Sequence, residues 1–387
     1  MQTPKKPKIV FNFVEAGLGH IMPMTAVYNA FCRKYSDKAE IVKTYFFQDT
    51  KNPKLKWVED ELITEVKKHN RQKGRGARQF KLLDFFGQRI GLKFLYGVKY
   101  GRGYKLAIER LKEFDADLIF NTHFATLYYC CSAKRKGIIN SKIYAYCPDP
   151  KIARQWDNRA DGIFVSSVKG KEDAEKDIFK DTEIGVIPFL IRDEVKEYKE
   201  SRAFYRGKLG LPTDNFTVLT HDGAYGAGKL EQTVNALVKS NVKMTVVAVC
   251  GKNEELYQKF LTLKPNPNIT FVPIGFTDKM IEYVASCDMF IGKAGASSLA
   301  EPAYFKAPQI VNFCATPIEE WISSHHVDYL KTATKVLDID QVVKTTEDWA
   351  QNPEKMKPYI DACAETSKAD GAEILADILY QKLISEK

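Results

Sequence analysis

The stretch from Gly292 to Glu301 combines small residues, hydroxyl groups and a carboxylate in an order that suits phosphate binding. An apolar run at 288–291 precedes it and predicts a buried strand, and residues 299–305 predict the start of a helix. A turn of small residues lets backbone N–H groups approach a ligand, and a helix N-terminus adds partial positive charge. The alternative is an ordinary strand-to-helix turn capped by Ser297 or Ser298, and this stretch alone does not choose between the two.

A second candidate is His20, which follows two glycines, Gly17 and Gly19, after an apolar run at 9–14. A helix is predicted to begin near Met22-Pro23, because proline is tolerated in a first turn. The third glycine of a dinucleotide fingerprint is missing, so the glycines alone are a weak nucleotide signal. A histidine at the head of that helix would lie at the edge of a parallel sheet where α/β proteins bind ligands. A turn histidine with only local hydrogen bonds is the alternative.

Strands and helices alternate along the chain in an order that starts twice, which predicts two Rossmann-like halves. Strands are expected at 9–14, 41–47, 118–120, 142–146, 162–165 and 183–189, and again at 216–220, 245–250, 269–272, 289–291 and 309–313. A glycine-rich loop at 221–228 and a helix at 229–239 repeat the arrangement of residues 9–31. The expected divisions are an N-terminal domain at 1–195, a C-terminal domain at 207–365 and an amphipathic C-terminal helix within 366–387.

Composition places the chain among ordinary globular proteins, with 44% hydrophobic and 28% charged residues over 387 positions. That length suits two domains at about 150 residues each. The eight cysteines are scattered without a CxxC pair, which argues against a zinc site and for a reducing compartment. No signal-peptide core or membrane-spanning run is found in the sequence, so a cytoplasmic location is expected.

The positive charge is concentrated between Arg71 and Lys105, where ten Lys or Arg residues accompany a single acid, Asp84. Apolar residues spaced by four run through the same segment, at Leu82, Phe86, Ile90, Phe94 and Val98. A stretch of this kind can lie in a membrane interface, with aromatic rings at the acyl boundary and cations on anionic headgroups. A solvated helix packed on the core and a nucleic-acid groove are the alternatives.

Taken together, these motifs resemble GT-B glycosyltransferases of the MurG and monogalactosyldiacylglycerol synthase type. The matching segments keep the family's order and spacing in the C-terminal half, at 249–253, 275–280, 285–288, 292–295 and 299–301. In the N-terminal half, residues 17–20 resemble the family's glycine-histidine loop. Residues 121–123 and the spacing of Asp149 and Trp156 resemble the lipid-synthase branch. The resemblance covers most of residues 8–330.

The resemblance implies an α/β protein with the GT-B fold, in which two Rossmann-like domains face a central cleft and the C-terminal helix crosses back to the N-terminal domain. It also implies an inverting transfer of a hexose or N-acetylhexosamine from a UDP-sugar to a membrane lipid such as diacylglycerol or a glycolipid. No metal and no other cofactor is expected. The expected partners are the UDP-sugar, the lipid acceptor and an anionic membrane surface, without nucleic acid. The expected location is the cytoplasm, at the inner face of the cell membrane.

Carried over by position, the donor site lies in the C-terminal domain. Glu301 would accept hydrogen bonds from the ribose hydroxyls, and Phe276 would lie beside the uracil. The residues implied to face the diphosphate or to close over it are Gly295, Ala296, Ser297, Ser298, Gly223, Tyr225 and Gly226. Glu319 and Glu320 stand where the family has a Gly-Gln-Glu motif for the sugar, so this chain departs from the family at its sugar contact.

On the acceptor side, His20 and Glu15 are the implied catalytic pair. An alcohol acceptor loses a proton as it attacks, so an imidazole or a carboxylate within reach acts as general base. Either residue fits that role, and a Glu15 that only orients His20 is the alternative. The other residues implied for the acceptor and the membrane are Gly19, Arg89, Lys93, Phe94, Lys99, His123, Asp149 and Trp156. The family's histidine four residues after the aspartate is replaced here by Ala153.

Other functions remain open from the sequence. MurG-like transfer of N-acetylglucosamine to a polyprenyl-linked acceptor is favoured by the run 19–23, and a UDP-sugar 2-epimerase shares the fold without needing a membrane. A non-catalytic nucleotide-binding protein and a basic nucleic-acid binder belong to different classes. Retention of Glu15, His20 and Glu301 argues against loss of activity.

Overall fold

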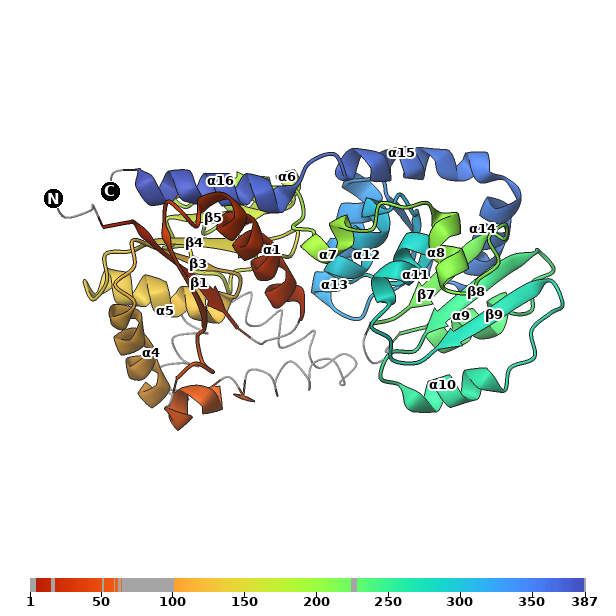
Figure 1. The fold of residues 1–387 in the computed structure, drawn as a ribbon, viewed down its shortest axis with the longest axis horizontal. Coiled ribbons are helices and arrows are strands. Elements are labelled where there is room, and N and C mark those ends of the chain that lie inside the picture. Colours follow the sequence, from red (N-terminus) through yellow and green to blue (C-terminus); the bar gives the residue numbers. More distant parts are fainter. Residues whose placement is uncertain are drawn as a thin grey trace. The chain divides into compact units, whose positions relative to one another are not determined.

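The computed structural model describes residues 5–14, 18–50, 52–58, 60–61, 64, 101–223 and 228–385. The chain forms two compact units (Figure 1), one made of Met1–Asp193 with Asp370–Lys387 and the other of Glu194–Ala369. Seven candidate site residues lie outside the described residues: Glu15, Arg89, Lys93, Phe94, Lys99, Tyr225 and Gly226. Gly17 and the basic segment as far as residue 100 lie outside them too.

The first unit is built on a parallel sheet in the order β2-β1-β3-β4-β5-β6. The strands are β1 (Lys8–Phe13), β2 (Glu40–Tyr45), β3 (Leu118–Asn121), β4 (Lys142–Cys147), β5 (Gly162–Val165) and β6 (Glu183–Val186). All four residues of β3 and all four of β5 are buried. Continuous burial of this kind is expected when helices cover both faces of a parallel sheet.

Helices α1 (Leu18–Tyr35), α4 (Gly101–Glu113), α5 (Phe124–Arg135) and α6 (Val168–Glu175) belong to this unit, and the boundary with the second unit falls within α7 (Asp193–Lys196), after Asp193. The C-terminal helix α16 (Gly371–Ile384) lies along α1 (Figure 1), which confirms that it returns to the N-terminal unit. Leu375 and Leu379 are buried in one core with Phe31. Burying each leucine side chain stabilises the fold by about 1.5–3 kcal/mol. Arg33 of α1 also forms ion pairs with Asp193 and with Glu373 of α16.

The start of α1 differs from the sequence prediction. The helix begins at Leu18 rather than near Met22-Pro23, so Pro23 lies inside it. The hydrogen bond that Pro23 cannot donate would have reached the carbonyl of Gly19, four residues earlier. That carbonyl belongs to the first helical turn. His20 consequently lies in this turn instead of ahead of the helix.

The second unit contains a parallel sheet in the order β12-β11-β10-β7-β8-β9. Its strands are β7 (Thr217–His221), β8 (Met244–Val249), β9 (Ile269–Ile274), β10 (Met289–Lys293), β11 (Gln309–Phe313) and β12 (Ala333–Lys335). Its helices are α8 (Arg202–Lys208), α9 (Leu230–Leu237), α10 (Glu254–Leu261), α11 (Met280–Ser286), α12 (Ala296–Tyr304), α13 (Pro317–Ser324), the π-helical η2 (His325–Tyr329), α14 (Ile339–Gln351), the 3-10 segment η3 (Pro353–Met356) and α15 (Lys357–Thr366). The predicted second βα series is therefore present.

Each sheet has one point where the strand order reverses. In the first unit the chain runs from β1 to β2 on one side and then returns to β3 on the other side of β1. In the second unit β7 lies in the same way between β8 and β10. Ligands of open α/β sheets bind outside the carboxyl ends of the strands at such a point. The ends of β1 and β3, and those of β7 and β10, are therefore the places to search for a site.

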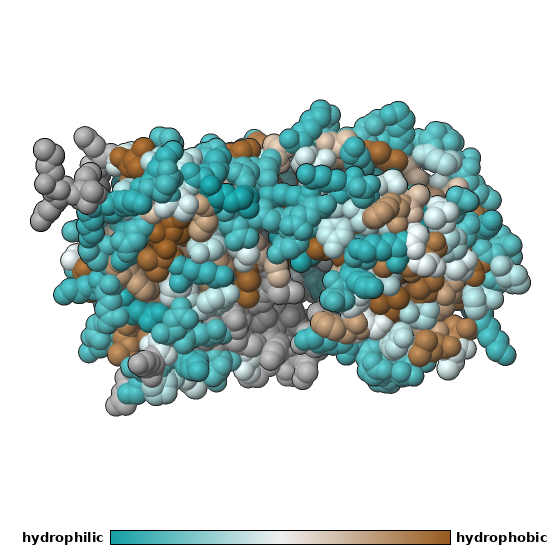
Figure 2. Space-filling model, in the orientation of Figure 1, coloured by the Kyte–Doolittle hydropathy of each residue, from teal (hydrophilic) through white to brown (hydrophobic). Residues whose placement is uncertain are grey.

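Hydrophilic residues cover most of the face drawn in Figure 2, with hydrophobic residues in scattered groups. Exposed large hydrophobic side chains include Phe276, Val168 and Phe204, which belong to separate elements. Within the described ranges, no helix is both long and apolar enough to cross a membrane.

Candidate functional site

The edge of the second sheet is formed by the loops that follow β7 and β10. The two strands are paired so that His221 lies opposite Gly292. Beyond this pair, the backbone N–H of Lys293 donates to Oδ1 of Asp222 over 3.0 Å. The side chain of Asp222 is almost fully buried, and this burial raises the pKa of its carboxyl group, although backbone hydrogen bonds oppose the rise. Asp222 thus ties the two loops together at the point of strand reversal.

The predicted phosphate turn leads directly into α12. Gly295 is the N-cap residue, in an extended conformation with φ −100°, and no side chain caps the helix. Ser297 and Ser298 lie in the first turn, so neither serine is the cap that the sequence offered as an alternative. A β-carbon at Gly295 would come within 2.9 Å of Ser298 Oγ. A small, uncapped helix start leaves backbone amides for an anion.

Lys293, to which the sequence analysis assigned no role, joins the end of β10 to the loop after β7 and to the start of α13. Its Nζ pairs with Oε1 of Glu319 over 3.0 Å, and a β-carbon on Gly223 would lie 3.3 Å from its Cε. Gly223 has φ +77°, a conformation that glycine adopts without strain. The sequence feature that could have pointed to Lys293 is its position as a cation at the carboxyl end of a predicted buried strand. Its partner is 26 residues away along the chain, where no spacing rule applies.

The two glutamates predicted to contact the sugar lie in the first turn of α13. Oε2 of Glu319 accepts from the backbone N–H of Ala315 over 2.5 Å, so both of its oxygens have protein partners. Glu320 pairs with Lys335 instead. The two neighbouring glutamates therefore have different partners, Lys293 and Ala315 for Glu319 and Lys335 for Glu320.

The remaining donor-side predictions fall on α12 and on the loop after β9. Glu301 is buried in the second turn of α12. Phe276 is 73% exposed, and the ammonium group of Lys252 lies 5.6 Å from the centre of its ring. An exposed aromatic ring beside a cation is a suitable surface for stacking a planar base.

At the edge of the first sheet, His20 and Thr122 join the first turn of α1 to the segment that follows β3. The ring Nδ1 of His20 lies 2.6 Å from the backbone oxygen of Thr122, and Thr122 Oγ1 donates to the backbone oxygen of His20 over 2.9 Å. A carbonyl oxygen only accepts hydrogen bonds, so Nδ1 carries the proton. In the neutral ring, Nε2 therefore keeps its lone pair.

Burial lowers the pKa of His20 from its ordinary value of 6.5, although the hydrogen bond to Thr122 opposes the shift. The imidazole is therefore neutral at pH 7. A neutral imidazole with a fixed Nδ1–H and an unprotonated Nε2 is equipped to accept a proton.

His123 has a structural role in this arrangement. It is the N-cap of α5, and its Nδ1 accepts from the backbone N–H of Ala125 over 3.2 Å. Its ring lies edge-on to that of His20, with centroids 4.7 Å apart. Burial, with His20 as a lesser cause, holds its pKa well below 6.5. His123 thus contributes a second neutral imidazole beside His20.

Asp149 follows β4, the strand next to β3, and so belongs to the same sheet edge. Burial raises the pKa of its carboxyl group from 3.8 to about 7. Trp156 is buried in the loop that follows. Gly19, in contrast, is exposed on the first turn of α1, with nothing within 4 Å of a β-carbon placed there. The first-sheet edge therefore combines His20, His123 and Asp149.

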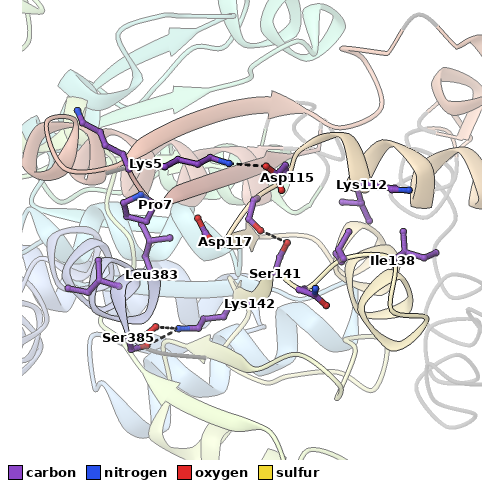
Figure 3. A pocket seen from close by; sticks show the side chains of 16 residues that line it. Lys5, Pro7, Lys112, Asp115, Asp117, Ile138, Ser141, Lys142, Leu383 and Ser385 are labelled. Carbon is purple, nitrogen blue, oxygen red and sulfur yellow. Dashed lines mark hydrogen bonds and ion pairs between the residues drawn. The ribbon is translucent and has the colours of Figure 1, made fainter. Parts of the chain in front are cut away.

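A cavity of about 930 Å³ lies at the opposite edge of the first sheet (Figure 3). Its lining comes from the amino ends of β1, β3 and β4 and from the end of α16. Lys5 pairs there with Asp115, and Lys142 donates to Ser385. Because ligands of such sheets bind at the carboxyl ends, this cavity is separate from the candidate site. In the part of the chain that the structure describes, no group of three or more His, Cys, Asp or Glu side chains could hold a metal ion.

Residues 218–379 match the glycosyltransferase family 28 C-terminal domain. The match begins in β7 and continues into α16, so it includes the whole edge formed by β7, β10 and α12.

Two curated proteins represent the two branches of the resemblance. Monogalactosyldiacylglycerol synthase 1 of Arabidopsis thaliana is 24% identical over 214 residues, which are 54% of this chain and 36% of that protein. This chain thus spans about a third of that relative's length. The UDP-N-acetylglucosamine–N-acetylmuramyl-(pentapeptide) pyrophosphoryl-undecaprenol N-acetylglucosamine transferase of Desulforamulus reducens is 24% identical over 303 residues, 72% of this chain and 76% of the relative.

Among solved structures, MurG of Acinetobacter baumannii covers 98% of this chain and 100% of its own, with a TM-score of 0.60 at 13% identity. The chain therefore has the GT-B fold, as the resemblance implied. The resemblance to the MurG and monogalactosyldiacylglycerol synthase type is confirmed by both relatives.

Proposed function

Because residues 218–379 form a glycosyltransferase family 28 C-terminal domain on a chain with the GT-B fold, we propose that this protein is an inverting glycosyltransferase. It transfers a hexose or N-acetylhexosamine from a UDP-sugar to a membrane lipid of the diacylglycerol or glycolipid type. No metal or other cofactor is part of this proposal. The observation that carries it is the uncapped start of α12 at the strand reversal between β7 and β10, within the family 28 domain.

On the donor side, the first-turn amides of α12 face the diphosphate. Their partial positive charge stabilises the charge that develops on the leaving UDP. Glu301 accepts hydrogen bonds from the ribose, and Phe276 offers its exposed ring to the uracil. The burial of Glu301 on α12 and the exposure of Phe276 beside Lys252 support these roles.

On the acceptor side, Nε2 of His20 takes the proton of the attacking hydroxyl group. The acceptor oxygen then forms its bond to the anomeric carbon as the bond from that carbon to the diphosphate oxygen breaks. Attack from the face opposite the leaving group inverts the configuration. The Nδ1 hydrogen bond to Thr122 supports this role, because it fixes the ring with Nε2 unprotonated.

The two relatives support a lipid acceptor, since one is a monogalactosyldiacylglycerol synthase and the other a pyrophosphoryl-undecaprenol N-acetylglucosamine transferase. The basic aromatic segment between Arg71 and Lys105 supports peripheral binding to an anionic bilayer. We place the protein in the cytoplasm at the inner face of the cell membrane.

A second candidate is transfer of N-acetylglucosamine to a polyprenyl-linked acceptor. It is favoured by the relative from Desulforamulus reducens, whose match extends over 76% of that protein.

The two candidates are separated by incubating the protein with single UDP-sugars, each combined with either diacylglycerol or a polyprenyl-diphosphate-linked sugar. Lipid products are then identified by mass. A hexosyl-diacylglycerol supports the first candidate, and a glycosylated polyprenyl lipid supports the second. Conversion of the UDP-sugar to an epimer without any lipid product would contradict both and indicate an epimerase.

A further inference from the structure

The side chain of Lys293 lies at the reversal point of the second sheet. Its backbone closes β10, and its Cε lies 3.3 Å from where a β-carbon of Gly223 would be, on the loop after β7. Its Nζ pairs with Glu319, which lies in the first turn of α13. The Lys293 side chain thus places a cation at the position where a ligand of an open α/β sheet binds.

The ion pair with Glu319 is only partly shielded from water. The Lys293 side chain is 23% exposed and that of Glu319 is 13% exposed. Partly exposed pairs of this kind are weak, because water screens the attraction and two side chains lose freedom. Glu319 also accepts from the N–H of Ala315, and its own N–H donates to Oγ1 of Thr316. Glu319 is therefore anchored at the start of α13 without Lys293, whereas the Lys293 amine donates to Glu319 as its side-chain acceptor.

We propose that Lys293 is the cation that binds the donor diphosphate, and that it changes partner when the donor arrives. Glu319 holds Lys293 in the donor-free protein, and the diphosphate then takes the ammonium group. This inference rests on the proposed use of a nucleoside diphosphate sugar.

Charge explains the direction of the exchange. A carboxylate offers one negative charge, whereas the diphosphate brings more than one and adds acceptor oxygens at the same edge. Charge-assisted hydrogen bonds to phosphate oxygens are among the strongest in proteins. The diphosphate also meets the amides of α12, so Lys293 and the helix start act on the same group. Glu319 competes with the diphosphate for Lys293: it holds the ammonium group at this edge until the ligand binds.

The alternative is a fixed ion pair that only joins β10 to α13. In that case Lys293 would remain on Glu319 in the complex and contribute nothing to diphosphate affinity. The two cases differ in what happens when each partner is changed separately.

The test measures dissociation constants for UDP and for uridine by titration calorimetry on four proteins: wild type, Lys293→Met, Glu319→Gln and the double variant. Lys293→Met should weaken UDP binding about tenfold or more, because it removes a charged hydrogen bond. It should leave uridine binding unchanged, since uridine lacks the diphosphate. Glu319→Gln keeps an acceptor for Ala315 and should strengthen UDP binding about two- to fivefold, because the competing partner is gone.

The double variant distinguishes a change of partner by Lys293 from a general effect of removing the negative charge of Glu319. If Glu319 acts through Lys293, Glu319→Gln gives no gain in the Lys293→Met background. An equal gain in both backgrounds would mean that any negative charge at this edge repels UDP, and it would overturn the exchange. Unchanged UDP affinity in Lys293→Met would overturn the whole inference.

Lys355→Met is the matched control, since it removes an exposed lysine from an ion pair with Asp348 on α14. It should leave both dissociation constants as in the wild type, and thermal melting checks that every variant is folded. If the wild type binds neither UDP nor uridine, the proposed function fails and this inference fails with it. If the wild type binds UDP and Lys293→Met binds it equally well, only this inference fails.

Discussion

Nδ1 of His20 lies 2.6 Å from the backbone oxygen of Thr122, although 102 positions separate the two residues in the chain. Thr122 completes the contact by donating its hydroxyl hydrogen to the backbone oxygen of His20. This reciprocal pair joins the ends of β1 and β3 at the reversal point of the first sheet. It also sets the tautomer of the imidazole, because a carbonyl can only accept.

His20→Asn should lower kcat by about a hundredfold to ten-thousandfold, the range expected for loss of a general base. Asparagine can still donate to the oxygen of Thr122 but cannot accept the proton of the acceptor. UDP affinity should stay within about twofold, because the proposed donor site lies in the other unit. Steady-state kinetics and calorimetry check both values. Turnover equal to the wild type would remove His20 from the mechanism.

The pH dependence of kcat/KM should show an acid limb with its midpoint below 6.5. Burial lowers the pKa of His20, so the base stays unprotonated to lower pH than a free histidine. The same shift makes the folded protein bind fewer protons than the unfolded chain just below pH 6.5. This contribution to stability is therefore complete above 6.5 and is lost as the pH falls from 6.5 through the lowered pKa of the folded protein. An acid limb near 7 would instead assign the titration to Asp149.

Asp149→Asn should stabilise the protein at pH 8 by at least about 1 kcal/mol. The folded protein holds the carboxyl group with a pKa of about 7, above its ordinary 3.8. The folded state thus binds more protons between these values, and its stability falls as the pH rises through that window. Asparagine does not ionise, so the gain should vanish at pH 4. Urea unfolding at both pH values measures it, and an equal effect at both would contradict the burial of this carboxyl group.

Gly223→Ala should weaken UDP binding as well as lower the melting temperature. Its φ of +77° is unfavourable for alanine, and the new methyl group would lie 3.3 Å from Cε of Lys293. Gly210→Ala is the matched control, because Gly210 has φ +69° with nothing within 4 Å of a β-carbon. Both variants should lose about 1 kcal/mol of stability, but only the first should lose UDP affinity. Equal UDP binding by the two variants would show that the space beside Lys293 is not used.

Neutralising Arg89, Lys93 and Lys99 should reduce sedimentation with vesicles that contain anionic lipid. Each cation near such a surface contributes about 1 kcal/mol to binding, so three substitutions should weaken it strongly. Vesicles of neutral lipid and a variant with three lysines removed from 355–368 are the controls. Sedimentation that does not change would leave the basic segment to another role.

The sequence by itself determined the order of the elements and the position of the small-residue turn before α12. Both depend on short-range features, namely the periodicity of apolar residues and the small residues between 292 and 298, which act over a few neighbours. The resemblance extended this to the GT-B fold and to the return of the C-terminal helix. The predicted start of α1 was wrong. The prediction placed Pro23 in the first turn, where proline is tolerated, but the helix already begins at Leu18.

Only the tertiary structure decided which side chains meet. The pairing of Lys293 with Glu319 and of His20 with Thr122 depends on the order in which parallel strands lie side by side, which brings the ends of distant strands to one edge. Local spacing carries no signal for such contacts. The tautomer of His20 follows from its hydrogen bond to Thr122, and the raised pKa of Asp149 follows from burial. Both exist only in the folded chain, because water surrounds these groups in the unfolded one.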